Sequence, residues 1–181
     1  MTHYIKGNLL EADCDYICHQ VNCHGKMGSG VAKQVREKWP SVYQEYVDKC
    51  EGKFMSGYYS RQMLGDIQVC DIENDKQVIN MFAQDGYGYD GKRYTSYDAF
   101  WECLIKMRDT CTDHSFAFPY KIASDRGGAN WAVIRTMIEE VLSDRKVYFY
   151  YLNEDDLDDR AKTYVIAEKY LNSTGGYPLD F

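Results

Sequence analysis

Short runs rich in β-branched and aromatic residues alternate with helical patterns along most of this chain of 181 residues. Helical patterns start at Val31, near Ser96 and near Gly128, and each repeats apolar side chains every three or four residues. Strands that alternate with helices in this way predict an α/β sandwich with a mixed sheet. The runs expected to form strands are 3–7, 16–21, 66–72, 77–83, 116–119 and 146–152.

The length fits one domain, and the charge restricts its partners. The net charge is −7 at pH 7, so the protein as a whole does not attract nucleic acid or an anionic membrane. We therefore expect recognition at a local site, with no membrane partner and no bulk nucleic-acid binding. The sequence has no apolar run of membrane-spanning length and no signal-peptide pattern at its start. Seven cysteines, mostly within apolar runs, are interpreted as reduced thiols of a soluble, cytoplasmic protein.

A glycine-rich turn joins the second strand-like run to the first helical pattern. It reads NCHGKMGSG and contains Gly25, Gly28 and Gly30, between an apolar run that ends at Val21 and the helix expected from Val31. Such a turn directs backbone N–H groups and the positive end of a helix at one spot, which suits phosphate oxygens. The spacing is neither that of a nucleoside-triphosphate loop nor that of the dinucleotide fingerprint.

A second turn of the same kind, PYKIASDRGGANW at 119–131, follows a short apolar strand and precedes the helix that carries Trp131. Two such loops in one α/β domain can hold a diphosphate from both sides. The alternative is that both are ordinary connections with turn glycines. Between them, the segment QDGYGYDGKRYTSYDAF at 84–100 is either a lid of tyrosines over the site or a surface loop.

The order of five segments resembles the macrodomain family over nearly residues 3–152. The segments are IKGNLLE, HQVNCHGKMGSGVA, INMFAQDGYG, PYKIASDRGGANW and VYFYYL. The resemblance is closest to the branch of bacterial and phage macrodomains, ADP-ribose-1″-phosphate phosphatases and terminal ADP-ribose protein glycohydrolases. It implies a three-layer α/β/α sandwich that binds ADP-ribose. We therefore expect a macrodomain core over residues 1–152, with residues 153–181 as an acidic and helical extension of the same domain.

The resemblance also implies where ADP-ribose lies. Asn8 meets adenine, and Tyr150 lies beside the base, although Tyr150 also suits a strand. Asn22 lies near the hydroxyls of the distal ribose, and the two glycine loops hold the diphosphate. The implied ligand-binding residues are Asn8, Leu9, Val21, Asn22, Met27, Gly28, Ser29, Gly30, Val31, Ile122, Ala123, Ser124, Arg126, Gly127, Gly128 and Tyr150.

The resemblance defines the chemistry less well than the binding. The catalytic Lys and Asp of the glycohydrolase branch fall at Gln84 and Gly127, so neither group is carried over. Asp125 is the candidate to activate water and His24 the candidate to supply a proton, with Gln84 at the same site. His19 lies in a strand and is interpreted as a core histidine. No spacing of Cys, His and Asp suggests zinc, and we expect no metal and no cofactor.

Three functions are compatible with the sequence. The preferred one is hydrolysis of an ADP-ribose derivative, either ADP-ribose-1″-phosphate or ADP-ribose attached to protein or nucleic acid, because the loops hold the ligand and Asp125 offers a base. The second is a non-catalytic ADP-ribose-binding module, which the missing Lys and Asp favour. The third is an unrelated α/β protein whose glycine loops are structural.

Overall fold

The computed structural model describes residues 2–55, 60–111 and 114–174 of the chain. The strands are β1 (Thr2–Lys6), β2 (Tyr16–Asn22), β3 (Ile67–Asp71), β4 (Gln77–Gln84), β5 (Ser115–Pro119) and β6 (Lys146–Tyr151). The α-helices are α1 (Gly30–Lys38), α2 (Pro40–Met55), α3 (Tyr97–Thr110), α4 (Trp131–Val141) and α5 (Asp159–Thr174). Short 3₁₀ turns are η1 (Leu9–Glu11), η2 (Ser60–Met63) and η3 (Glu154–Asp156). The strands expected from the sequence agree with these bounds to about one residue at each end.

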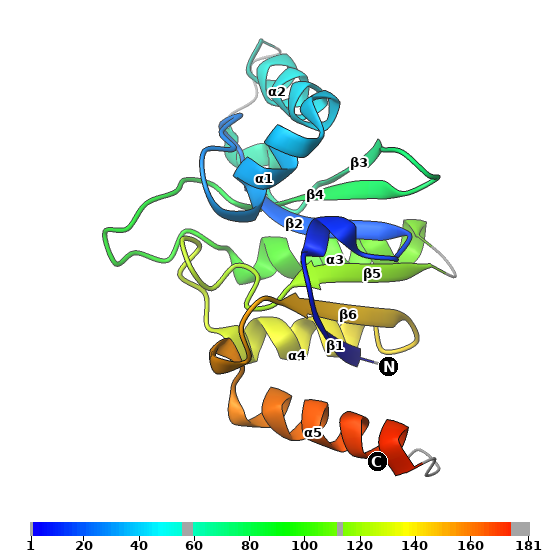
Figure 1. Cartoon of the computed structure of the whole chain (residues 1–181). Helices are drawn as coiled ribbons and strands as arrows, with labels where there is room; N and C mark the ends of the chain where they lie inside the picture. The colour runs from blue at the N-terminus through cyan, green and yellow to red at the C-terminus, as the bar shows by residue number, and fades with distance from the viewer. Residues whose placement is uncertain (1, 56–59, 112–113, 175–181) are drawn as a thin grey trace.

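The strands form one sheet in the order β1-β6-β5-β2-β4-β3, and every neighbouring pair is parallel except β3 and β4. The carboxyl ends of parallel strands share one edge, so the loops after β2, β4 and β5 gather there, at the left of Figure 1. The chain leaves β2 toward the β3 end of the sheet and leaves β5 toward β6, in the opposite direction. In open α/β sheets, ligands bind where the connections part in this way.

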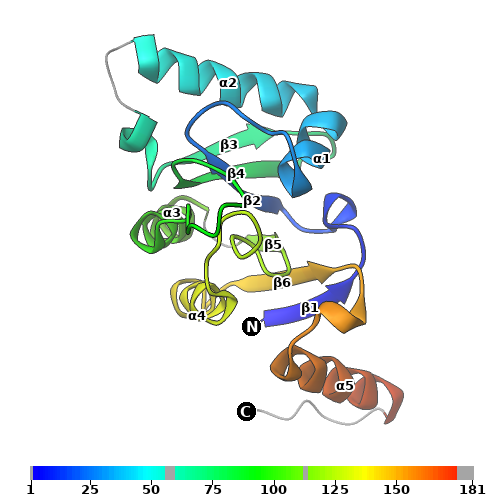
Figure 2. The same cartoon turned by 90° about the vertical axis from the view of Figure 1, so that its left-hand side faces the viewer.

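Helices cover both faces of the sheet (Figure 2). On one face, Ile17 and Val78 pack with Val35 of α1. On the other face, Cys18 and Ile79 pack with residues of α3 and α4. These strand residues are sequence neighbours, and successive side chains of a strand point to opposite faces. The three-layer α/β/α sandwich predicted for the chain is confirmed.

The first helical pattern continues as two helices, which the sequence did not predict. α1 ends at Lys38, and α2 begins at Pro40. Proline cannot donate a hydrogen bond inside a helix but fits the first helical position, so it ends one helix and starts the next. Val42 and Tyr46 are fully buried and continue the apolar face of the pattern into α2.

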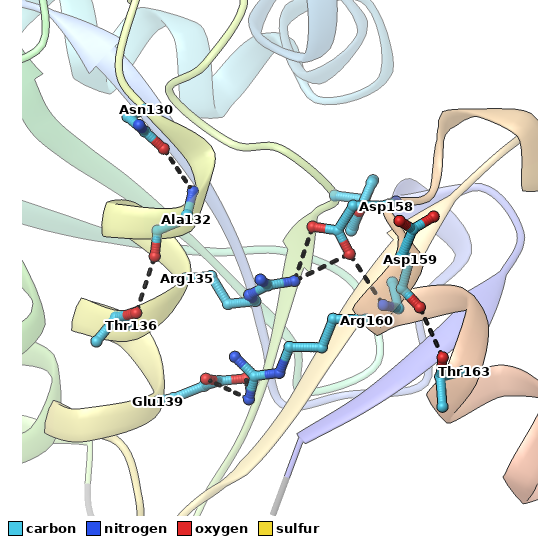
Figure 3. A network of polar contacts seen from close by, with 11 residues as sticks. Asn130, Ala132, Arg135, Thr136, Glu139, Asp158, Asp159, Arg160 and Thr163 are labelled. Carbon is cyan, nitrogen blue, oxygen red and sulfur yellow. Dashed lines mark hydrogen bonds and ion pairs between the residues drawn. The ribbon is translucent and has the colours of Figure 1, made fainter.

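Two ion pairs join α4 to the start of α5, which lies beside β1 (Figures 1 and 3). The Nη1 atom of Arg135 lies 2.9 Å from an oxygen of Asp158, and the Nη2 atom of Arg160 lies 2.9 Å from an oxygen of Glu139. Asp158 also accepts the N–H of Ala161 at 2.9 Å and so caps the first turn of α5. The segment after residue 152 is therefore packed onto the sandwich through the start of its helix.

All seven cysteines are buried, and none forms a disulfide. Burial raises the pKa of the Cys14 thiol to about 11, so this thiol is neutral at pH 7. Among the described residues, the structure has no helix with the length and apolar character needed to cross a membrane.

Candidate functional site

A cleft of about 430 Å³ opens at the carboxyl edge of the sheet, between the loops that follow β2 and β5. This volume lies within the usual range of small-molecule sites. The ends of β2, β4 and β5 contribute to its wall, and the start of α1 closes one side. The lining brings together many of the residues predicted from the sequence, namely Val21, Asn22, Met27, Gly28, Ser29, Gly30, Val31, Gln84, Ile122, Ala123, Asp125, Arg126 and Gly127.

The side chain of Asn22 organises the first loop. Its Oδ1 atom accepts the N–H of His24 at 2.9 Å and the hydroxyl of Tyr46 at 2.9 Å, while its Nδ2 atom donates to the carbonyl of Lys26 at 2.6 Å. Asn22 is only 6% exposed. The amide that the resemblance assigned to the ribose hydroxyls is therefore engaged within the loop, although Asn22 does line the cleft.

The first loop ends at Ser29, the N-cap residue of α1. Its hydroxyl does not cap the helix and instead accepts a hydrogen bond from Nη1 of Arg126 in the second loop. The next residue, Gly30, has φ of +55°, which glycine adopts without steric strain. As a result, the N–H groups in the first turn of α1 have no side-chain cap, and the residues that carry them belong to the lining of the cleft.

The second loop has a constrained backbone. Lys121 and Ala123 have φ values of 59° and 66°, in the left-handed region that non-glycine residues rarely adopt. The carbonyl of Ala123 accepts the N–H of Ala129 at 3.0 Å and the hydroxyl of Thr95 at 3.3 Å, which fixes this conformation. Gly127 is packed so closely that a Cβ atom would overlap the carbonyl oxygen of Ala123. Strained backbone that its surroundings hold in place is common at ligand sites.

Backbone N–H groups on both loops have no hydrogen-bond partner within the described part of the chain. In the first loop and the start of α1 they belong to residues 27–32, and in the second loop to Ala123 and residues 125–127. All of these residues line the cleft. Convergent N–H groups beside a helix N-terminus form a nest for anionic oxygens. Both loops thus present unpaired N–H groups to one cleft, and phosphate binding there stays a prediction.

Curated and solved proteins are similar to this chain in sequence and in fold. A DNA ADP-ribosyl glycohydrolase of Thermus aquaticus is 26% identical over 145 residues, which cover 78% of this chain and 38% of that protein. An ADP-ribose 1″-phosphate phosphatase of Meyerozyma guilliermondii is 31% identical over 96 residues, covering 48% of this chain and 55% of that protein. The solved macrodomain of Thermus aquaticus DarG has a TM-score of 0.65 at 25% identity, covering 83% of this chain and 98% of that one. The chain has the macrodomain fold.

No protein-family model matches the sequence of this chain. The chain spans 38% of the length of the glycohydrolase and 55% of the length of the phosphatase. The solved DarG macrodomain, in contrast, is covered almost completely. The likeness therefore concerns the macrodomain itself.

Gln84, which the resemblance aligned with the catalytic lysine of the glycohydrolase branch, is 8% exposed. Its Oε1 atom accepts from Nε2 of Gln20 at 2.5 Å, and its own Nε2 atom donates to the carbonyl of Gly86 at 2.8 Å. The Nε2 atom of Gln20 also donates to the hydroxyl of Thr95 at 2.9 Å. Both ends of the Gln84 amide are therefore held by neighbours, and a carboxamide has no nucleophilic amine.

The two candidate acid–base groups occupy different places in this macrodomain. Asp125 lines the cleft, and within the described residues its carboxylate forms no hydrogen bond or ion pair. His24 lies outside the lining, with its Nε2 atom 3.3 Å from an oxygen of Asp85. The other oxygen of Asp85 lies 2.8 Å from Nε of Arg61. His24 is thus oriented by a carboxylate beside the first loop, whereas Asp125 has access to the cleft.

His19 belongs to the wall of the cleft as well as to the core. Its Nε2 atom lies 2.6 Å from Oδ1 of Asn80, and Nδ1 is buried without a partner. Burial lowers the pKa of His19 to about 4, so the ring is neutral at pH 7. Because Oδ1 can only accept, Nε2 carries the proton. Among the described residues, which include His19, no group of three or more His, Cys, Asp or Glu side chains is placed to hold a metal ion.

Five predicted ligand residues are not in the lining of the cleft, namely Asn8, Leu9, Ser124, Gly128 and Tyr150. Oδ1 of Asn8 accepts the N–H of Leu10 at 3.1 Å and so caps η1. Leu9 and Tyr150 share a hydrophobic cluster with Val31, which does line the cleft. Leu9 and Tyr150, which were expected near adenine, are therefore linked to the cleft through the cluster that Val31 also joins.

The other two residues outside the lining stabilise the second loop from within. The hydroxyl of Ser124 donates to the carbonyl of Ile122 at 3.2 Å. The N–H of Gly128 donates to the carbonyl of Asp125 at 3.0 Å, and Gly128 has φ of +67°. These contacts close the turn that presents Asp125 and the residues after it to the cleft.

Sequence reasoning missed the cationic part of the lining. Lys26, Arg36 and Lys121 line the cleft, as do three tyrosines, Tyr43, Tyr87 and Tyr120. Lys26 and Lys121 lie inside the two glycine loops, so their position was a usable signal. Arg36 reaches the cleft from the second turn of α1, and no sequence pattern marked it.

Proposed function

We propose that this chain binds ADP-ribose in the cleft and hydrolyses an ADP-ribose derivative, either ADP-ribose-1″-phosphate or ADP-ribose attached to protein or nucleic acid. One observation carries the proposal: unpaired backbone N–H groups from two loops line one cleft of an acidic protein. Such groups suit the oxygens of a diphosphate, which the negative net charge would otherwise repel. The activities named for the glycohydrolase and phosphatase relatives belong to the same class and support it.

In the proposed reaction, Asp125 acts as the general base for one water molecule. The water oxygen bonds to the phosphorus of the terminal phosphate, or to the C1″ carbon of the distal ribose, while Asp125 takes its proton. The leaving group departs with the bonding electrons and takes a proton from water, because His24 lies outside the lining and faces Asp85 at 3.3 Å. The products are ADP-ribose and either phosphate or the freed acceptor. The exposed position of Asp125 in the lining supports its role as base.

The second candidate function is a non-catalytic ADP-ribose-binding module. It is favoured by Gln84, whose amide is held at both ends at the position where a catalytic lysine would lie. A module of this kind uses the same N–H groups but turns over no derivative.

One panel tests both functions. The protein is incubated with ADP-ribose-1″-phosphate, an ADP-ribosylated peptide and an ADP-ribosylated oligonucleotide, and release of ADP-ribose is followed by mass spectrometry. Calorimetry with ADP-ribose and with adenosine is run in parallel. Release from any derivative supports the hydrolase, and ADP-ribose binding without release selects the binding module. Absence of ADP-ribose binding would refute both functions.

A further inference from the structure

The cleft carries an excess of positive charge in an acidic protein. Its ionised lining consists of Lys26, Arg36, Lys121 and Arg126 against one carboxylate, Asp125. Within the described residues, none of these four cations forms an ion pair. Three of them lie over tyrosine rings at 4.4 to 5.6 Å and so have neutral neighbours. The chain as a whole has a net charge of −7, so this local field is specific to the cleft.

Arg126 has the most defined position of the four cations. From the second loop it crosses to the first, where Nη1 donates to the hydroxyl of Ser29. Its guanidinium lies 4.4 Å from the centre of the Tyr89 ring, in the loop after β4. The Nε atom is buried and has no hydrogen-bond partner. A guanidinium on a residue that lines a cleft, with one buried donor unsatisfied and no anion paired with it, is suited to receive an anion.

The head of Arg126 lies between the first loop and the segment that follows β4. Ser29 is the N-cap residue of α1, and Tyr89 belongs to the segment after Gln84. The loop N–H groups supply donors for a diphosphate without help from this side chain. Under the proposed function, the Gln84 side is where the distal ribose lies. Through Tyr89, the guanidinium is connected to the segment that leads from Gln84, and so to the end of the ligand that varies between derivatives.

We propose that Arg126 and Ser29 form a subsite for a further phosphate beside the distal ribose, so that the chain selects ADP-ribose derivatives that carry one. The inference rests on the proposed ADP-ribose site. In the ligand complex, Arg126 exchanges the Ser29 hydroxyl for phosphate oxygens, which it binds through Nε and Nη1 together. The released hydroxyl of Ser29 then donates to the same phosphate. Two ligands offer this chemistry: the terminal phosphate of ADP-ribose-1″-phosphate, or a backbone phosphate beside an ADP-ribosylated base.

The test measures selectivity by competition against a fluorescent ADP-ribose, read before turnover. The ligands are ADP-ribose, ADP-ribose-1″-phosphate, and an ADP-ribosylated oligonucleotide with its unmodified counterpart as control. We expect the unaltered protein to bind at least one phosphate-bearing ligand about tenfold or more tighter than ADP-ribose, the usual scale of a charge-assisted contact. In Arg126→Gln this ratio falls to near one, while the affinity for ADP-ribose falls only as far as it does in Arg36→Gln, because both variants remove one positive charge from the lining.

Arg36→Gln is the matched control, because it removes the same charge from the lining at a distance from the subsite. It should lower the affinity for all ligands together and keep their ratio. Circular dichroism and the melting temperature check that each variant is folded. A ratio near one in the unaltered protein, or an equal loss for all ligands in Arg126→Gln, would overturn the subsite. No binding of ADP-ribose by the unaltered protein would instead refute the proposed function.

Discussion

Asp158 is expected to stabilise the fold through a partly buried ion pair with Arg135. A second, more exposed ion pair between the same two helices serves as the control. Arg135 and Asp158 join α4 to α5, as do Arg160 and Glu139 (Figure 3). The side chain of Arg135 is only 9% exposed, whereas that of Arg160 is 59% exposed. The two pairs have similar chemistry and distances, so they differ mainly in burial.

Asp158→Asn removes one charge, keeps an oxygen that can cap Ala161, and leaves the guanidinium of Arg135 buried without a counter-charge. Breaking a fully buried pair in this way costs about 3–5 kcal/mol. Asp158 is 33% exposed, so water compensates in part, and we expect a loss of about 2 kcal/mol in the free energy of unfolding. Arg160→Gln breaks the exposed pair and should cost less than about 0.5 kcal/mol.

Urea denaturation at pH 7 measures both values, and equal losses in the two variants would refute the reasoning. The pH dependence gives a second check. Burial alone would raise the pKa of Asp158, but the hydrogen bond from Ala161 and the charge of Arg135 lower it below its ordinary value of 3.8. A carboxylate with a depressed pKa stabilises the folded state above the unfolded pKa, and this stabilisation disappears as the pH falls below about 4. Asp158→Asn should remove that part of the acid dependence.

Three further predictions concern the cleft. Burial lowers the pKa of His19 to about 4 in the folded state, so the unfolded state binds more protons as the pH falls below about 6.5. The free energy of unfolding should therefore fall by about 2 kcal/mol between pH 7 and pH 5. His19→Gln should flatten this pH dependence when it is measured by urea denaturation. Gly127→Ala should cost about 2 kcal/mol or more, because its Cβ overlaps backbone, whereas Gly28→Ala, with no atom within 4 Å, should cost less than about 1 kcal/mol by thermal denaturation. Asp125→Asn should keep the affinity for ADP-ribose within a few fold but reduce turnover by ~10² or more in a single-turnover assay; loss of affinity and stability together would show that Asp125 only orders its loop.

The fold was predictable because its signals are local. Period-2 and period-3.6 patterns identify strands and helices from neighbouring residues, and the glycines mark both loops before any contact is known. The division between α1 and α2 was missed for the same reason. Pro40 lies inside one continuous apolar pattern that runs from Val35 through Val42, and a local pattern does not show whether such a proline kinks a helix or begins a new one.

The partnerships within the cleft were not predictable in this way. Ser29 and Arg126 are 97 positions apart, and their hydrogen bond depends on the sheet placing β2 beside β5. Sequence reasoning assigned Ser29 and Asn22 to the ligand by resemblance, yet the structure shows the Ser29 hydroxyl on Arg126 and the amide of Asn22 on its own loop. Whether such a side chain bonds to a ligand or to its own loop depends on the geometry of the fold, which residue types do not specify.

In the cleft, backbone groups and side chains have different roles. The amides of Asn22 and Gln84 hold loops and strand ends, while unpaired N–H groups and cations remain for an anionic ligand. A site that binds through backbone depends on loop conformation and so tolerates much sequence change, which agrees with the preserved fold at 25% identity to the DarG macrodomain. Chemistry depends on a few side chains, and the resemblance implies that these are not carried over at Gln84 and Gly127. We therefore expect binding and catalysis to be separable, and the proposed hydrolysis depends on Asp125, which lines the cleft and whose carboxylate has no hydrogen bond or ion pair among the described residues.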